Sequence, residues 1–116
     1  MIYNTLATVV FALTANSAIA LEMPTELQVD LMEGNRTWST ADACFAADLI
    51  REEFYEKVTT VPRALYQTLI GTFGFEEVQE VSRRSDNYVL ALHAMRDQAI
   101  AGEPQLLQFY CDQLGY

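Results

Sequence analysis

Apolar residues recur at helical spacing from Ser39 onward, and charged residues occupy the other side of the pattern. Ser39 and Asp42 stand in the Ser-x-x-Asp relation that satisfies free amides at the start of a helix. The spacing predicts an amphipathic helix of about 18 residues. Its inward positions are Cys44, Ala47, Leu49 or Ile50, Phe54 and Val58.

This helix is expected to end at Thr59-Thr60-Val61-Pro62. Proline suits the first turn of a new helix, because its missing N–H would have no partner there in any case. We therefore predict a second helix from Pro62 to about Phe73, with Leu65 and Leu69 facing inward. Gly74 follows as a natural left-handed cap.

The segment before the first predicted helix shows no sustained period and contains Pro24, Gly34 and Asn35. We expect residues 21–38 to form an extended lead-in, whose Leu-Gln-Val-Asp-Leu alternation could add an edge strand. A chain this short supports one core, so residues 39–116 are predicted to be a single globular domain. The lead-in would lay its apolar side chains on that core: Leu27, Val29, Leu31 and Trp38.

Two interpretations compete for the segment after Gly74. In the first, strands Val78–Arg84 and Tyr88–Met95 pair across the turn-rich Ser85-Asp86-Asn87, and a third strand contains Leu107, Phe109 and Cys111. In the second, Asp86 caps a helix and Gly102-Glu103-Pro104 starts a last one, which helix propensity favours. That helix would carry Tyr88, Leu92, Met95 and Ala99.

Residues 1–20 have the features of a cleavable export signal. Leu6 to Ala15 is an uncharged apolar run, and Ala18-Ile19-Ala20 is a small-x-small triplet that predicts cleavage before Leu21. The alternative is an uncleaved anchor, but a spanning helix needs about 20 apolar residues and this run is shorter. We expect a periplasmic or secreted protein with no stable membrane insertion after cleavage.

The two cysteines, Cys44 and Cys111, lie far apart in the sequence. Disulfides persist in the compartments that exported proteins reach, and two cysteines allow one pairing. Their spacing excludes a Cys-x-x-Cys redox pair and a zinc knuckle. We predict a structural disulfide that stabilises the fold by roughly 4 kcal/mol on the chain-entropy model.

Charge adds a constraint on partners. The chain has 16 acidic and 7 basic side chains, a net charge of −9. Such a surface repels nucleic acid and anionic lipid, so we expect neither as a partner. It suits a basic protein partner, or it serves solubility alone.

Three stretches after the second predicted helix form a pattern: Gly74-Phe75 with Val78 and Val81, then Asp86-Asn87-Tyr88-Val89-Leu90-Ala91, then Phe109 to Gly115. From about Val61 to Tyr116 this order resembles small exported PepSY-like domains, in which a helix leads into an antiparallel meander. The resemblance favours the strand interpretation. The predicted fold is therefore α+β, with two N-terminal helices packed on a small antiparallel β-meander and one disulfide; an all-α helical bundle is the alternative.

Catalytic chemistry is not indicated. The single histidine, His93, has no nucleophile or metal motif around it in the sequence, and a solvated histidine is the simpler interpretation. Two carboxylate clusters lack the spacing of a calcium loop and are expected to be a charged helix face and a strand edge. We expect a non-enzymatic protein with no metal and no cofactor. The clusters are Glu52-Glu53-Glu56 and Glu76-Glu77-Glu80.

Aromatic residues are the main functional indication, because tyrosine and tryptophan supply rigid contact area at interfaces. Trp38, Tyr88 and Tyr110 are the predicted partner-binding residues; the alternative is that they cap the edge of the core. The PepSY-like resemblance implies a domain that binds or restrains another exported protein. A periplasmic acid-stress holdase chaperone is the second hypothesis, and a degenerate enzyme using Glu or His93 as base is the third.

Overall fold

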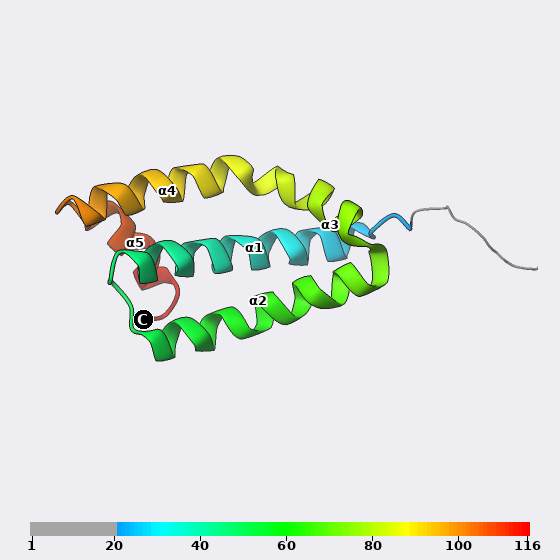
Figure 1. Cartoon of the computed structure of the whole chain (residues 1–116), viewed down its shortest axis with the longest axis horizontal. Coiled ribbons are helices and arrows are strands. Elements are labelled where there is room, and N and C mark those ends of the chain that lie inside the picture. Colours follow the sequence, from blue (N-terminus) through cyan, green and yellow to red (C-terminus); the bar gives the residue numbers. More distant parts are fainter. Residues whose placement is uncertain (1–20) are drawn as a thin grey trace, which may run out of the picture.

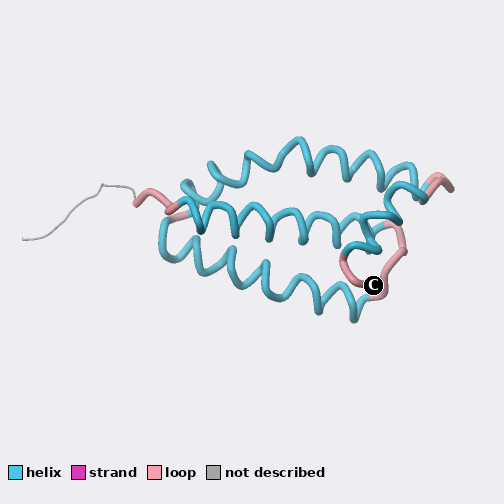
Figure 2. The backbone as a smooth tube through the Cα atoms, turned by 180° about the vertical axis from the view of Figure 1, so that it is seen from behind, coloured by secondary structure: helices cyan, strands magenta, loops and turns pink. Residues whose placement is uncertain are grey.

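The computed structural model describes residues 21–116, and every regular element in this range is a helix (Figures 1 and 2). The predicted α+β fold is therefore wrong for these residues, and the all-α alternative is the correct one. The predicted signal peptide, residues 1–20, lies outside the described part. The elements are α1 (Thr25–Ala46), α2 (Glu52–Phe73), α3 (Phe75–Ser82), the 3-10 turn η1 (Arg83–Ser85), α4 (Asp86–Ile100) and α5 (Gln105–Gln113).

Helix α1 occupies most of the segment predicted to be an extended lead-in. It begins directly after Pro24, and Leu27 and Leu31 pack inward four residues apart. Gly34 lies inside the helix, where α2 comes close: a Cβ at this position would be 3.7 Å from the Cα of Pro62. That distance is an ordinary van der Waals contact, so Gly34 is a helical position packed against α2 and does not mark a loop. Ser39 is an interior residue of α1, so the predicted capping pair with Asp42 is also wrong.

The predicted long helix from Ser39 is interrupted between Ala46 and Glu52. Asp48 takes a left-handed conformation with φ 62°, and the chain reverses there. The Leu49 N–H donates to the Cys44 carbonyl at 2.8 Å, which closes the end of α1. Ile50 is buried in the reversal. The apolar spacing continued across this break because both sides of the hairpin face one core.

Pro62 lies inside α2 and does not end a helix, contrary to the prediction. Proline within a helix loses one i→i−4 hydrogen bond, here the bond to the Val58 carbonyl. Its ring is buried against α1 near Gly34, so packing offsets part of that loss. The predicted end of the helix at Phe73 is confirmed, and Gly74 has a positive φ of 92°.

The segment after Gly74 follows the helical interpretation. Val78 and Val81 are buried three residues apart, as one face of α3 requires. In α4, Leu92 is fully buried, whereas Leu90 is 62% exposed. A strand would place Leu90 and Leu92 on the same face, so the burial pattern contradicts the predicted meander. The last helix begins after Gly102-Glu103-Pro104, as that interpretation predicted.

Helix α1 is the centre of the molecule, with α2 on one side and α4 on the other (Figure 1). Helix α5 packs against α1 and α4. The predicted disulfide is present: Cys44 of α1 and Cys111 of α5 are bonded, with their Cα atoms 5.9 Å apart. Within residues 21–116 no helix is long and apolar enough to cross a membrane.

The buried apolar side chains form two separate clusters along α1. The disulfide cluster lies at the end of α1 near α5 and includes Cys44, Ile50, Leu92, Leu107 and Cys111. The α3 cluster lies at the other end, where the start of α1 meets α2 and α3. Its buried members are Met23, Leu31, Leu69, Val78 and Val81.

Candidate binding grooves

Because α2 and α4 flank α1 from opposite sides, two faces of α1 remain at the surface, and grooves form over them. The Trp38 groove lies over one face, between α2 and the α3–α4 segment. Its volume is about 320 Å³. Its lining includes Asn35, Trp38, Asp42, Tyr66, Gln79 and Asp86.

The other face of α1 carries two grooves. The Tyr88 groove has a volume of about 170 Å³ and is lined by Arg36, Thr37, Thr40, Tyr88, Tyr110, Gln113 and Leu114. The Pro62 groove has a volume of about 540 Å³ and is lined by residues of α1 and α2. Those residues are Asp30, Glu33, Gly34, Thr37, Val58, Val61, Pro62 and Leu65.

Two aromatic rings and two carboxylates characterise the Trp38 groove. Trp38 and Tyr66 meet edge to face, with ring centroids 5.9 Å apart and planes at 81°. This geometry is one that aromatic pairs prefer. Asp42 and Asp86 are the charged residues of the lining, and no lysine or arginine among the described residues lines it. The groove therefore combines aromatic surface with negative charge.

The position of Asp42 is set by Tyr55 on α2. The Tyr55 hydroxyl donates to Asp42 Oδ1 at 2.5 Å. Partial burial, together with the hydrogen bond to Asp42 and the negative charge of Asp42, raises the pKa of Tyr55 above its ordinary value of 10.0. Tyr55 thus remains a neutral donor at any physiological pH, and it holds one carboxylate oxygen while the other is free for a ligand.

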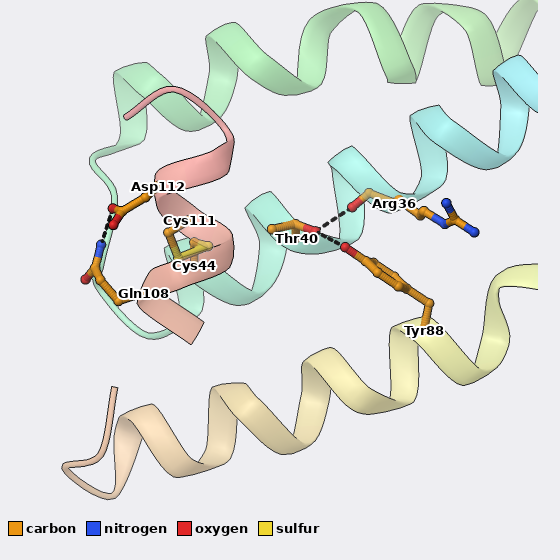
Figure 3. Close-up of a disulfide and its surroundings, with 7 residues drawn as sticks. All are labelled: Arg36, Thr40, Cys44, Tyr88, Gln108, Cys111 and Asp112. Atoms are coloured by element: carbon orange, nitrogen blue, oxygen red, sulfur yellow. Dashed lines mark hydrogen bonds between the residues drawn. A yellow bond between two sulfur atoms is a disulfide. The ribbon is translucent and has the colours of Figure 1, made fainter. Parts of the chain in front are cut away.

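Several residues that line the Tyr88 groove contact one another (Figure 3). The Tyr88 hydroxyl lies 3.1 Å from the Thr40 hydroxyl, which itself donates to the Arg36 carbonyl at 2.7 Å. The Arg36 guanidinium lies over the Tyr88 ring, 5.5 Å from its centroid. Both the polar end and one face of Tyr88 already have partners. Tyr88 therefore joins α4 to α1.

The three predicted partner-binding residues do not form one surface. Tyr88 and Tyr110 line the same groove, but Trp38 lines the groove over the opposite face of α1. Helical periodicity explains the separation, because Trp38 and Thr40 are two positions, or about 200°, apart on α1. The sequence prediction took this segment as extended, and in an extended segment residues two positions apart lie on the same face, so it did not reveal the separation.

Sequence reasoning did not identify three members of the Trp38 groove: Asp42, Tyr66 and Asp86. Asp42 could have been found, since it lies four residues after Trp38 and shares its face once the segment is taken as helical. Tyr66 and Asp86 come from other helices. Their approach to Trp38 depends on how the helices pack, and no local pattern indicates it.

The two carboxylate clusters contribute to helix structure. Glu52 and Glu53 lie in the first turn of α2, and Glu76 and Glu77 in the first turn of α3. Negative charge at a helix start interacts favourably with the helix dipole. The strand-edge role predicted for the second cluster is therefore wrong. Glu77 also accepts a hydrogen bond from the Met23 amide at 3.0 Å.

His93 is exposed on α4. Residues 21–116 contain no cluster of three or more His, Cys, Asp or Glu side chains that could bind a metal ion. That the protein is not an enzyme stays a prediction.

Comparison of the chain with protein-family models, with curated proteins and with solved structures found no match. With no strand in the described residues and no matching family, the PepSY-like resemblance carries no further argument.

Proposed function

We propose that this chain is an exported, non-enzymatic binding protein that holds a positively charged segment of another exported protein in the Trp38 groove. The observation that carries the proposal is the arrangement of Trp38 and Tyr66 beside Asp42 and Asp86. An arginine or lysine in this groove can contact an aromatic face and a carboxylate at the same time.

The energetics of such a contact are favourable. A cation over a tryptophan face contributes about 0.5–2 kcal/mol, depending on how far water is excluded. An exposed ion pair adds up to about 1 kcal/mol. Neither Asp42 nor Asp86 forms an ion pair with a described basic residue, so both carboxylates are available. The net charge of −9 attracts a basic partner at range.

The disulfide supports the compartment that the proposal needs. Cys44 and Cys111 are both fully buried and bonded. Disulfides of this structural kind persist in the periplasm and outside the cell. The proposed partner is therefore another protein of an oxidising compartment.

The test uses Trp38 as its own reporter, because it is the only tryptophan in the chain. A synthetic peptide of alternating Lys and Leu is titrated into the oxidised protein while tryptophan emission is recorded. The same peptide with Glu in place of Lys is the charge control. We expect saturable emission changes with the Lys peptide and none with the Glu peptide.

A matched pair of double variants separates the groove from net charge. Asp42→Asn with Asp86→Asn should weaken binding of the Lys peptide about tenfold. Glu22→Gln with Glu103→Gln removes the same charge at exposed positions outside the three grooves and should change affinity less than about twofold. Equal weakening by the two pairs would show a diffuse charge effect and contradict the proposal.

A second candidate is the acid-stress holdase, and the division of the core favours it. The disulfide ties the cluster around Cys44, whereas the α3 cluster is held by packing and by the Met23–Glu77 hydrogen bond. Most carboxylates are neutral at about pH 3, so the chain then becomes strongly positive and repels itself. Opening of the α3 cluster would expose Leu31, Leu69 and Val78 to unfolded clients.

Light scattering of an aggregating client distinguishes the two candidates. A holdase suppresses client aggregation at about pH 3 and has no effect at about pH 7. If the chain gives no suppression at acid pH, the holdase candidate is removed and peptide binding at neutral pH remains as the proposal.

A further inference from the structure

The Pro62 groove lies over the face of α1 opposite the Trp38 groove, and it is the larger of the two, at about 540 Å³. Its α2 wall is apolar: Val58, Val61, Pro62 and Leu65. Val61 is 73% exposed, the highest value among the large apolar residues of the described chain. Val58 and Leu65 are half-buried and Pro62 is buried, so Val61 is the part of this apolar wall that is most open to a partner.

The α1 wall of this groove provides the charge. Asp30 and Glu33 line it, and neither forms an ion pair with any described basic residue. In the part of the chain that the structure describes, no lysine or arginine contributes to the lining. Charge complementarity therefore requires a partner that carries basic residues beside its apolar ones.

Pro62 also removes one backbone hydrogen-bond donor from the interior of α2. Because proline has no N–H, the Val58 carbonyl lacks the donor that every other interior turn of α2 provides. Within residues 21–116 no side chain donates to this oxygen.

The spacing of the two walls matches a helix. Val58, Val61 and Leu65 span two turns of α2, and Asp30, Glu33 and Thr37 span two turns of α1. A third helix laid along α1 and α2 can pack its apolar ridge between them, as in helix-in-groove recognition. An extended peptide would point every second side chain away from the groove.

We infer that the Pro62 groove is a second docking site, which takes a basic amphipathic helix of a partner protein with its apolar face on α2 and its lysines or arginines on Asp30 and Glu33. This site is separate from the Trp38 groove and does not depend on the function proposed for it.

The probe is a labelled peptide of about 18 residues with Leu at i, i+3, i+4 and i+7 and Lys elsewhere. A scrambled peptide of the same composition is its control. Binding is measured by fluorescence anisotropy, and helix formation in the bound peptide by circular dichroism. We expect the amphipathic peptide to bind and gain helix, and the scrambled peptide to bind at least about fivefold more weakly.

Matched variants locate the site. Val61→Lys places a positive charge in the groove and should weaken binding about tenfold. Leu90→Lys makes the same change on α4 at a position that is 62% exposed and lines none of the three grooves, so affinity should be retained. Circular dichroism of both free variants checks that they keep the helical fold.

Three results would overturn the inference. The first is equal binding by Val61→Lys and Leu90→Lys. The second is loss of the amphipathic peptide in the Asp42→Asn, Asp86→Asn variant, which would place it in the Trp38 groove. The third is that the free chain forms a dimer and that Val61→Lys dissociates it. The Pro62 groove would then bind a second copy of this chain and not a partner helix.

Discussion

Single residues decide where this chain turns and which positions tolerate change. Gly74 connects α2 and α3 with φ 92° and ψ 156°, a conformation that residues with a side chain rarely adopt. Gly71, three residues earlier, is an ordinary helical residue with open space where a Cβ would be. The two glycines therefore have opposite roles although they lie one turn apart.

Alanine substitution at these two sites should have effects of opposite sign. Gly74→Ala must adopt a strained backbone and should lower the free energy of unfolding by about 1–3 kcal/mol. Gly71→Ala gains helix propensity and should raise it by up to about 1 kcal/mol. Urea denaturation of both variants measures the difference. A stabilising Gly74→Ala would show that the turn adapts without strain.

Tyr55 should give the molecule a pH-dependent term in the alkaline range. Its pKa is raised by burial and by Asp42, so the native state holds the phenolic proton more tightly than the unfolded state does. The stabilisation is present below pH 10.0, the ordinary value, and is lost as pH rises through the raised pKa. The free energy of unfolding should therefore fall as the pH rises above 10.0 toward the raised pKa of Tyr55.

Tyr55→Phe tests this interpretation. Denaturation at several alkaline pH values should show a weaker fall in the variant than in the wild type. The alkaline rise in absorbance near 295 nm should be smaller in the variant by the contribution of one tyrosine. If the two proteins show the same pH dependence, Tyr55 does not contribute the alkaline term.

Among the elements, α5 depends most on the covalent bond. It is nine residues long and buries two side chains, Leu107 and Cys111. Helices this short are marginal without tertiary support. The Cys44–Cys111 bond closes a loop of 67 positions and fixes α5 to the end of α1 (Figure 3).

Removal of the disulfide should destabilise the protein strongly. The double variant Cys44→Ala, Cys111→Ala should lose roughly 4 kcal/mol of unfolding free energy on the chain-entropy model. Guanidinium denaturation checks the value, and reduced wild-type protein is the control that keeps both side chains in place. An unchanged denaturation midpoint after reduction would show that packing alone holds α5.

On the scale of the whole molecule, grooves lie over two faces of α1, between the helices that flank it. The chain carries a net charge of −9, and three ion pairs connect described residues. Each of these pairs has at least one largely exposed partner, so they contribute little to stability. The main effect of the excess negative charge is therefore long-range electrostatic attraction of positively charged partners.

The association rate of the alternating Lys and Leu peptide should accordingly depend on salt. Between about 0.02 M and about 0.3 M salt, screening shortens the reach of the protein's field. We expect the association rate constant to fall about tenfold, with a smaller change in the dissociation rate constant. Stopped-flow measurement of Trp38 emission gives both constants. A salt-independent association rate would exclude electrostatic attraction as the cause of capture.

Several features could be predicted from the sequence because their causes are local or covalent. Two cysteines permit one pairing, and the structure contains it. Gly74 ends α2 because only glycine adopts its backbone conformation readily, and Gly102-Glu103-Pro104 precedes α5 for similar reasons. In each case the nature of the side chain restricts the backbone directly.

The remaining features required the packed structure, because their cause lies in a distant segment. Gly34 and Pro62 normally indicate loops or helix ends, yet each lies inside a helix where the two helices approach closely. The choice between strand and helix for residues 86–100 depended on which apolar residues find partners, and burial of Leu92 with exposure of Leu90 decided it. Trp38 and Tyr88 line different grooves because these grooves lie over opposite faces of the central helix α1. The sequence by itself determined the disulfide partners and the turns, whereas the packing of α2 and α4 on opposite sides of α1 decided the fold and the position of each groove.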